Sequence, residues 1–254
     1  MTTDIVSIAG WRGAYGEPRR SKPKTNAERA ADFKRALDIR RHSRPIAGTP
    51  GETYLRSRGL LPDVVLYGPT GWPASIRWAE DAVRLPTPPV KPGIVIDVQD
   101  AATGAVTGIH RIFFRRDGMV EKDASGKKAK IALGAVWGNA AMLDCPPDPE
   151  GQWGIAEGVE TAMAARQLYR IPVWAAIFGG NMRAITPPPW ARSIFIFADR
   201  DAISKKGYRP GFKFAADALR LWRWRSGVES VRVLAHRREG ADLVDLLQEI
   251  PYVG

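Results

Sequence analysis

The last hundred residues alternate short apolar runs with helix-like stretches, and this alternation is what most limits the folds open to the chain. Apolar runs occupy residues 153–156, 173–178, 193–198 and 231–235, and helical patterns occupy residues 159–169, 213–224 and 241–249. Strands that alternate with helices favour a mostly parallel sheet covered by helices on both faces. We therefore expect an α/β domain, of Rossmann-like architecture, over residues 151–254.

Acidic residues follow several of these apolar runs. Glu157 comes directly after the first, Asp199 and Asp201 come directly after the third, and Asp242 follows the last. Active sites of such sheets gather at the carboxyl ends of the strands. Asp199 and Asp201 are two residues apart, so on an extended chain they face the same side and can grip one hard cation. Glu157 would complete the site or act on a proton, and we expect Mg²⁺, or Mn²⁺ in its place.

A different interpretation of the same acidic residues is that they cap helices. Carboxylates at the rim of an α/β sheet often accept hydrogen bonds from the first turn of the next helix. This alternative applies most directly to Asp242 and Asp245. Glu160 and Asp245 remain further candidates for the metal site. The helix that follows Gly158 offers N–H groups to a phosphate, and a glycine there leaves room for the phosphate to approach.

The charge of the chain points to a polyanionic partner. The formal net charge is +11 and the pI is about 10.0. Residues 1–60 carry 13 Lys and Arg against 6 Asp and Glu. An excess of this kind favours nucleic acid as the partner. The single cysteine, Cys145, excludes a disulfide framework and a cysteine-rich zinc site. No apolar run approaches the roughly 20 residues of a membrane span, so we expect a cytoplasmic protein without a membrane partner.

The first 150 residues divide into three predicted parts. Residues 1–25 form a flexible basic tail, residues 26–61 a small helical module that begins with Asn26 as its cap, and residues 62–150 a β-rich subdomain. Strand patterns cover residues 93–98 and 106–114, and residues 101–104 suit the turn of a hairpin. Residues 62–92 are rich in Pro and Trp and match no element pattern.

Three stretches of the C-terminal part, in this order, resemble the Toprim domain shared by primases and topoisomerases. Residues 156–162 (AEGVETA) resemble its first motif, a glutamate after a strand with a glycine where the helix begins. Residues 197–201 (FADRD) resemble its Asp-x-Asp motif, and residues 240–247 (GADLVDLL) resemble the later acidic motif of primase-like members. The resemblance implies catalytic roles for Glu157, Asp199 and Asp201, with Asp242 as a further metal ligand.

The resemblance extends upstream of this domain. Residues 45–60, 108–111 and 130–134 are similar to segments of primase-like Toprim proteins from phages, plasmids and integrated mobile elements. It implies that basic residues in or beside these segments bind the phosphates of template or nucleotide. With the glycine at the helix start, the candidates for nucleic-acid and nucleotide binding are Arg56, Arg58, Arg111, Lys128, Lys130 and Gly158.

The function implied by the resemblance is that of a DNA primase catalytic core. Such a core joins ribonucleotides into short RNA primers on single-stranded DNA, and it depends on Mg²⁺. One cysteine cannot build the zinc module of replicative primases, and no phosphate loop of a helicase is present. A separate helicase or template-capturing protein is therefore an expected partner. Two alternatives remain: a metal-dependent Toprim nuclease, and a DNA-binding accessory protein without catalysis.

Two further stretches are open to two interpretations each. Residues 221–225 (LWRWR) suit either stacking on unpaired bases or packing of Trp222 on the sheet, and helical spacing favours packing. Residues 179–182 (GGNM) follow an apolar run, and they suit either a close approach to substrate or a simple turn.

Overall fold

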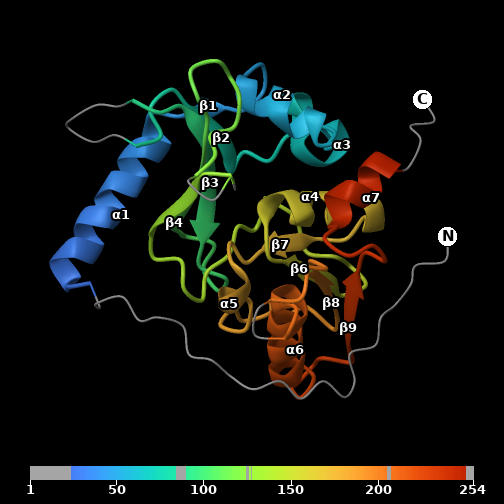
Figure 1. Cartoon of the computed structure of the whole chain (residues 1–254). Helices are drawn as coiled ribbons and strands as arrows, with labels where there is room; N and C mark the ends of the chain where they lie inside the picture. The colour runs from blue at the N-terminus through green and yellow to red at the C-terminus, as the bar shows by residue number, and fades with distance from the viewer. Residues whose placement is uncertain (1–23, 84–89, 124–125, 127, 205–206, 250–254) are drawn as a thin grey trace.

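A computed structural model describes residues 24–83, 90–123, 126, 128–204 and 207–249 (Figure 1). It contains two sheets, an antiparallel one in the first half of the chain and a parallel one in the second half. Residues 1–23 of the predicted basic tail lie outside the described residues. The predicted class is confirmed: a mixed α/β chain has a C-terminal parallel sheet preceded by a β-rich part and helices.

The first helix packs on the antiparallel sheet. Helix α1 (Asn26–Arg41) begins at Thr25, whose side chain accepts from the backbone of Glu28 while the Glu28 carboxylate accepts from Thr25. The expected cap, Asn26, is therefore wrong by one residue, because this reciprocal pair of hydrogen bonds satisfies the first turn from Thr25. Ala36 and Ile39 of α1 are fully buried against the sheet. The helix lies along one face of the sheet in Figure 1.

Five strands make the antiparallel sheet, in their order along the chain. They are β1 (Arg44–Pro45), β2 (Ile76–Ala79), β3 (Gly93–Gln99), β4 (Val106–Phe113) and β5 (Lys130–Gly134). Between β1 and β2 the chain forms α2 (Pro50–Ser57), α3 (Val64–Tyr67) and the 3-10 turn η1 (Gly68–Thr70). Strand β3 is buried on both faces, because α1 covers one face, and α2 together with apolar residues of the second half of the chain covers the other.

The parallel sheet has the strand order β7-β6-β8-β9. Its strands are β6 (Gln152–Ala156), β7 (Val173–Ala175), β8 (Ser193–Ala198) and β9 (Ser230–Ala235). The helices are α4 (Val159–Tyr169), α5 (Gly179–Met182), α6 (Pro210–Trp222) and α7 (Leu243–Glu249). Helices α4 and α7 cover one face, whereas α5 and α6 cover the other, as the predicted alternation requires.

Apolar packing and backbone hydrogen bonds join the two halves. One buried cluster contains Ile94 and Ile112 of the antiparallel sheet together with Phe197 of the parallel sheet. Ala140 exchanges two backbone hydrogen bonds with Gln99, and the next residue, Ala141, exchanges two with Ala175. The segment between β5 and β6 thus bridges both sheets. Within the described residues, no helix has the length and apolar character needed to span a bilayer.

Candidate active site at the edge of the parallel sheet

Glu157 and Asp199 leave the same edge of the parallel sheet. They directly follow β6 and β8, which are neighbours paired with Ala156 opposite Phe197. Burial and, after it, the charges of Glu157, Asp242 and Asp201 together raise the pKa of Asp199 to about 7. Glu157, Asp201 and Asp242 therefore lie close enough to Asp199 for their charges to act on it.

Asp201 has a structural contact besides its place in this cluster. Its Oδ2 accepts a hydrogen bond of 2.7 Å from the backbone N–H of Gly211, in the first turn of α6. A side chain at Gly211 would place its Cβ only 2.2 Å from the carbonyl oxygen of Asp199. Gly211 is thus required for the close approach of α6 to the Asp199 loop. Gly211 is not among the residues predicted from the sequence, although the Pro-Gly pair at residues 210–211 is a recognisable helix start.

Asp242 and Asp245 cap the start of α7. Asp242 Oδ1 accepts hydrogen bonds from the N–H groups of Val244 and Asp245, at 2.8 and 3.2 Å, and Asp245 Oδ2 accepts from the N–H of Asp242 at 2.9 Å. Burial raises the pKa of Asp242. The capping interpretation therefore describes their contacts, while the charge of Asp242 still reaches Asp199.

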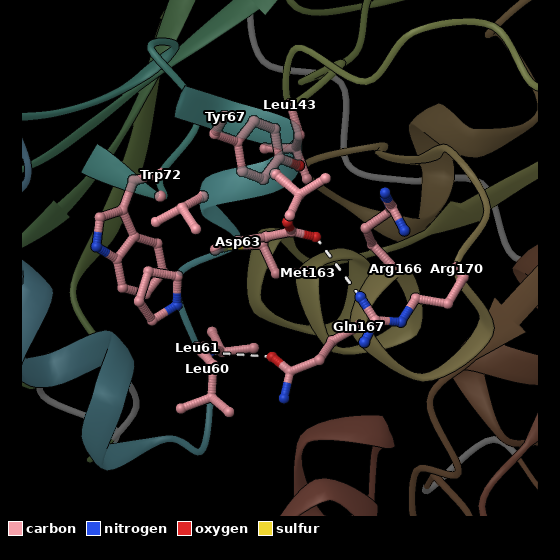
Figure 2. A pocket seen from close by; sticks show the side chains of 14 residues that line it. Leu60, Leu61, Asp63, Tyr67, Trp72, Leu143, Met163, Arg166, Gln167 and Arg170 are labelled. Atoms are coloured by element: carbon pink, nitrogen blue, oxygen red, sulfur yellow. Dashed lines mark hydrogen bonds and ion pairs between the residues drawn. The ribbon is translucent and has the colours of Figure 1, made fainter. Parts of the chain in front are cut away.

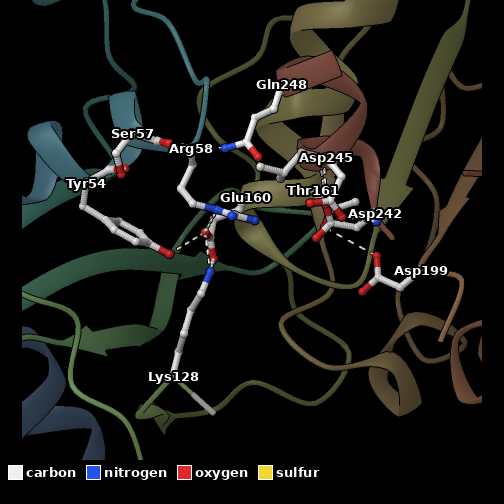
Figure 3. Close-up of polar contacts among 11 residues, drawn as sticks. Tyr54, Ser57, Arg58, Lys128, Glu160, Thr161, Asp199, Asp242, Asp245 and Gln248 are labelled. Carbon is white, nitrogen blue, oxygen red and sulfur yellow. Dashed lines mark hydrogen bonds and ion pairs between the residues drawn. The ribbon is translucent and has the colours of Figure 1, made fainter. Parts of the chain in front are cut away.

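Glu160 is the centre of an ion-pair cluster beside these carboxylates (Figure 3). Its oxygens accept from Lys128 Nζ at 2.7 and 2.9 Å and from the Tyr54 hydroxyl at 2.6 Å, and Arg58 Nε lies 3.4 Å away. Burial opposes ionisation of Glu160, but Lys128 and the hydrogen bonds outweigh it and lower its pKa. These contacts engage Glu160 in holding α2 and the β5 segment against α4.

The other predicted basic residues lie on different surfaces. Lys130 is exposed and pairs with Ile112 across β4 and β5, on the sheet face that meets the parallel sheet, and its charge lowers the pKa of Asp199. Arg111 lies on the opposite face, where it donates to the carbonyl of Ala82 at 2.9 Å. Burial lowers the Arg111 pKa to about 10.

Arg56 and Gly158 lie apart from Lys130 and Arg111, on α2 and at the start of α4. Arg56 pairs with Glu52 at 2.8 Å and lies over the Trp72 ring. Gly158 is the N-cap of α4, where no side chain caps the helix, and a Cβ there would meet nothing nearer than 3.7 Å. The residues predicted to bind phosphate therefore do not share one surface. They lie on both faces of the antiparallel sheet and at the start of α4.

The carboxylate cluster fits a hard divalent cation by its chemistry. Among the described residues, no three acidic, histidine or cysteine side chains converge as a complete metal cage. The acidic neighbours of Asp199 offer carboxylate oxygens, which Mg²⁺ and Mn²⁺ prefer. Burial and the charges of these neighbours disfavour the ionised form of Asp199 and raise its pKa, and a bound cation would offset both effects. Mg²⁺ keeps several waters and needs only one or two protein carboxylates, so a complete cage is not required.

A separate hollow of about 360 Å³ lies at the far end of α4 (Figure 2). Apolar side chains of the segment around α3 line it together with Met163, Arg166 and Gln167 of α4. The Gln167 carboxamide oxygen accepts from the N–H of Leu61 at 3.0 Å. None of the predicted metal ligands lines this hollow, so it is distinct from the candidate active site.

Comparison with protein families divides the chain in two. Residues 152–250 match the Toprim domain, and residues 30–143 match a domain of unknown function, DUF7146. The second half of the chain therefore matches the Toprim model, and the protein resembles primase-like Toprim proteins, as the motifs predict. No curated protein sequence matches the chain.

Several primase structures share the fold. The Aquifex aeolicus primase, with its zinc-binding and RNA polymerase domains, is 16% identical at a TM-score of 0.53, and the match covers 90% of this chain and 59% of that one. The E. coli primase catalytic core is 13% identical at 0.51, with coverages of 87% and 74%. A DnaG primase catalytic domain bound to single-stranded DNA is 13% identical at 0.53, with coverages of 88% and 79%. The chain thus has a primase-like fold and spans about three fifths of the A. aeolicus structure.

Proposed function

We propose that this protein is a DNA primase-type catalytic core that joins ribonucleotides on a single-stranded DNA template. The observation that carries the proposal is the crowding of Glu157, Asp199, Asp201 and Asp242 at one edge of a Toprim sheet. The fold supports it, because the antiparallel part and the Toprim domain are together matched by primase cores. Phage or mobile-element replication, with a separate helicase or template-capturing partner, is the setting that we propose.

In this proposal Glu157, Asp199 and Asp201 hold Mg²⁺, with Asp242 as a further ligand. The cation, when bound, neutralises the charge that develops on phosphate oxygens during nucleotidyl transfer. Lys130 faces the same edge and supplies positive charge to the incoming phosphates. Gly158 leaves the first N–H groups of α4 accessible to a phosphate oxygen.

For the other predicted phosphate-binding residues we propose indirect roles. Arg58 and Lys128 hold Glu160 and so fix the β5 segment, which carries Lys130, against α4. Arg111 is buried on the face that α1 covers, and Arg56 is paired with Glu52, so their contacts support the antiparallel part of the molecule. Direct phosphate contacts by these four residues remain predictions from the sequence.

The test is incubation of the protein with single-stranded DNA, labelled ribonucleotides and Mg²⁺, beside the double variant Asp199→Ala, Asp201→Ala. We expect short labelled products that the variant does not make. A parallel reaction with labelled DNA detects hydrolysis. Metal-dependent shortening of the DNA would identify a nuclease instead, and binding without either reaction would identify an accessory protein.

A further inference from the structure

Two exposed aromatic rings stack on each other near the candidate active site. Trp137, in the loop after β5, is 60% exposed, and Phe178, the residue before α5, is 40% exposed. Their ring centroids lie 6.4 Å apart, and the ring planes are inclined by 30°. One face of Trp137 meets Phe178, and the exposed area of its ring is left to solvent. Large apolar rings are usually buried, so an exposed pair calls for a functional explanation.

A fully buried asparagine holds the loop that presents Trp137. Asn181 has 0% exposure. Its Oδ1 accepts from the N–H of Gly138 at 2.8 Å, and its Nδ2, which has two hydrogens to share, lies 3.1 and 2.9 Å from the carbonyl oxygens of Val136 and Asn139, on both sides of Trp137. The same Nδ2 lies 2.8 Å from the carbonyl oxygen of Ala176, two residues before Phe178. A single buried amide therefore fixes the backbone that carries both rings, so the pair is pre-organised.

The backbone that carries Phe178 is strained and runs past a predicted metal ligand. Ile177 has a φ of 74°, a left-handed conformation that a β-branched residue rarely adopts. Strain of this kind persists only where surrounding contacts impose it, and it clusters at functional sites. On the other side of Phe178, a Cβ added to Gly179 would stand 2.7 Å from Oε2 of Glu157. The aromatic pair therefore adjoins the carboxylate edge.

The size of the pair and its surroundings decide which ligand it fits. Two such rings offer at most about 300–500 Å², against about 800 Å² for each side of a standard protein interface. Aromatic rings of this size match the stacking area of one or two nucleic-acid bases, and stacking does not depend on base identity. A net charge of +11 attracts a polyanionic strand. These features favour a base over a protein partner.

We propose that Trp137 and Phe178 form a stacking platform for an unpaired base of the single-stranded DNA template. This inference rests on the proposed function and adds a base-binding site to it. The platform holds a template base beside Glu157, while Lys130 and the carboxylate cluster act on the phosphates of the nucleotides. Asn181 is a positioning residue, because it fixes the loop and has no exposed surface for a ligand.

The experiment measures the affinity for a fluorescein-labelled single-stranded oligonucleotide by anisotropy, without Mg²⁺ and without nucleotides. We expect Trp137→Ala and Phe178→Ala each to weaken binding about tenfold, and Trp137→Phe to retain most of the affinity. The matched control is Trp224→Ala. Trp224 is 78% exposed and lies under the Arg223 guanidinium, just beyond the end of α6 and about 20 Å from its start near Asp201. We expect this control to bind like the wild type.

An oligonucleotide of abasic sites isolates stacking from backbone contacts. We expect the wild type and Trp137→Ala to bind it equally. Equal affinity of wild type, Trp137→Ala and Phe178→Ala for the normal oligonucleotide would overturn the platform and leave the proposed catalysis standing. A separate titration measures the binding of free ribonucleoside triphosphates. If Trp137→Ala and Phe178→Ala lost affinity only for these nucleotides, the platform would also be overturned, because the template base would then not be the ligand. No binding of single-stranded DNA by the wild type would contradict both proposals.

Discussion

Asp199 is the residue of the candidate site whose pKa is raised by the charges of the other carboxylates. Its carboxylate is largely buried, the Thr161 hydroxyl lies 3.5 Å from its Oδ1, and three other carboxylates raise its pKa (Figure 3). Lys130 offsets only part of this effect. In the absence of a cation, folding therefore places a negative charge where the protein disfavours it, and this cost is the physical basis for expecting a cation there.

The first prediction concerns Asp199→Asn. The pKa of Asp199 rises from 3.8 in the unfolded chain to about 7 in the fold, so the folded protein binds more protons between these values and its stability falls as pH rises through them. In EDTA at pH 8 the variant should be more stable than the wild type by roughly 2–3 kcal/mol. The gap should shrink towards pH 4. Urea unfolding across this range measures it, and a gap independent of pH would contradict the account.

The same comparison with Mg²⁺ provides a second readout. Mg²⁺ should raise the melting temperature of the wild type more than that of Asp199→Asn, because the variant has lost a charged ligand. Equal shifts for the two proteins would argue against Asp199 as a ligand.

The second prediction concerns Gly211. An alanine there would bring Cβ to 2.2 Å from the Asp199 carbonyl, so Gly211→Ala should lower the free energy of unfolding by about 1–3 kcal/mol. Gly180→Ala is the matched control, since its Cβ would meet no atom nearer than 3.9 Å. Urea unfolding of both variants checks the prediction. Equal stability of the two would show that the α6 start does not need its glycine.

At the scale of elements, local sequence patterns predicted the strands and helices whose whole length packs regularly in the parallel sheet and its covering helices. The predicted strand over residues 193–198 matches β8, and the predicted helix over residues 159–169 matches α4. The predicted strand over residues 173–178 ends early, at Ala175, because Ile177 adopts a positive φ and α5 begins after Phe178. Apolar character alone does not reveal such a turn, because its contacts include the buried Asn181 side chain, which bonds both the Ala176 carbonyl and residues 136–139.

The candidate site was predictable where it depends on sheet topology. Acidic residues after neighbouring parallel strands must share an edge, and this places Glu157 beside Asp199. Arg111 of β4 pairs with Ile131 of β5, and Lys130 is the neighbour of Ile131, so strand alternation puts Arg111 and Lys130 on opposite faces. The sequence does not show which face meets the parallel sheet. The partners of Glu160 come from residues 106 and 32 positions away, so no local pattern could identify them.

The packing of α6 follows its helical spacing. Trp222 is 3% exposed and packs near Trp153, which confirms the packing interpretation of residues 221–225 for this side chain. Trp224, two residues later, is exposed at the end of the helix. The two tryptophans therefore differ in exposure, because Trp222 lies on the face of α6 that packs on the sheet and Trp224 lies beyond the end of the helix.

The third prediction tests how α2 and β5 are held against α4. Glu160→Gln should cost about 3 kcal/mol, because it leaves Lys128 and Arg58 without their carboxylate. The pKa of Glu160 is lowered below 4.5 by folding, so its contribution is present above that pH and is lost as pH falls further. Glu229→Gln, at an exposed pair with Arg192, is the control and should change little. Denaturation at pH 7 and pH 4 measures both, and a small effect of Glu160→Gln at pH 7 would contradict the role.

At the scale of the whole molecule, a basic protein surrounds an acidic edge. Under the proposed function, the +11 charge would attract the phosphate backbone of a template, while the carboxylates would repel it unless a cation intervenes. The fourth prediction is that affinity for single-stranded DNA falls steeply with salt. With about four phosphate contacts it should drop roughly 50-fold between 50 and 200 mM salt. Anisotropy titrations measure the slope, and affinity independent of salt would exclude backbone contacts as its source.

The measurement that tests the central claim most directly is the formation of the first dinucleotide on a defined single-stranded template. Wild-type protein, Mg²⁺ and two labelled ribonucleotides should yield a product whose sequence is complementary to the template, and a changed template should change the product. The variant Asp199→Asn should make at least about 100-fold less, and Trp224→Ala should make as much as the wild type. Equal synthesis by Asp199→Asn, or a product that ignores the template, would contradict the proposal that this carboxylate edge is the active site of a primase core.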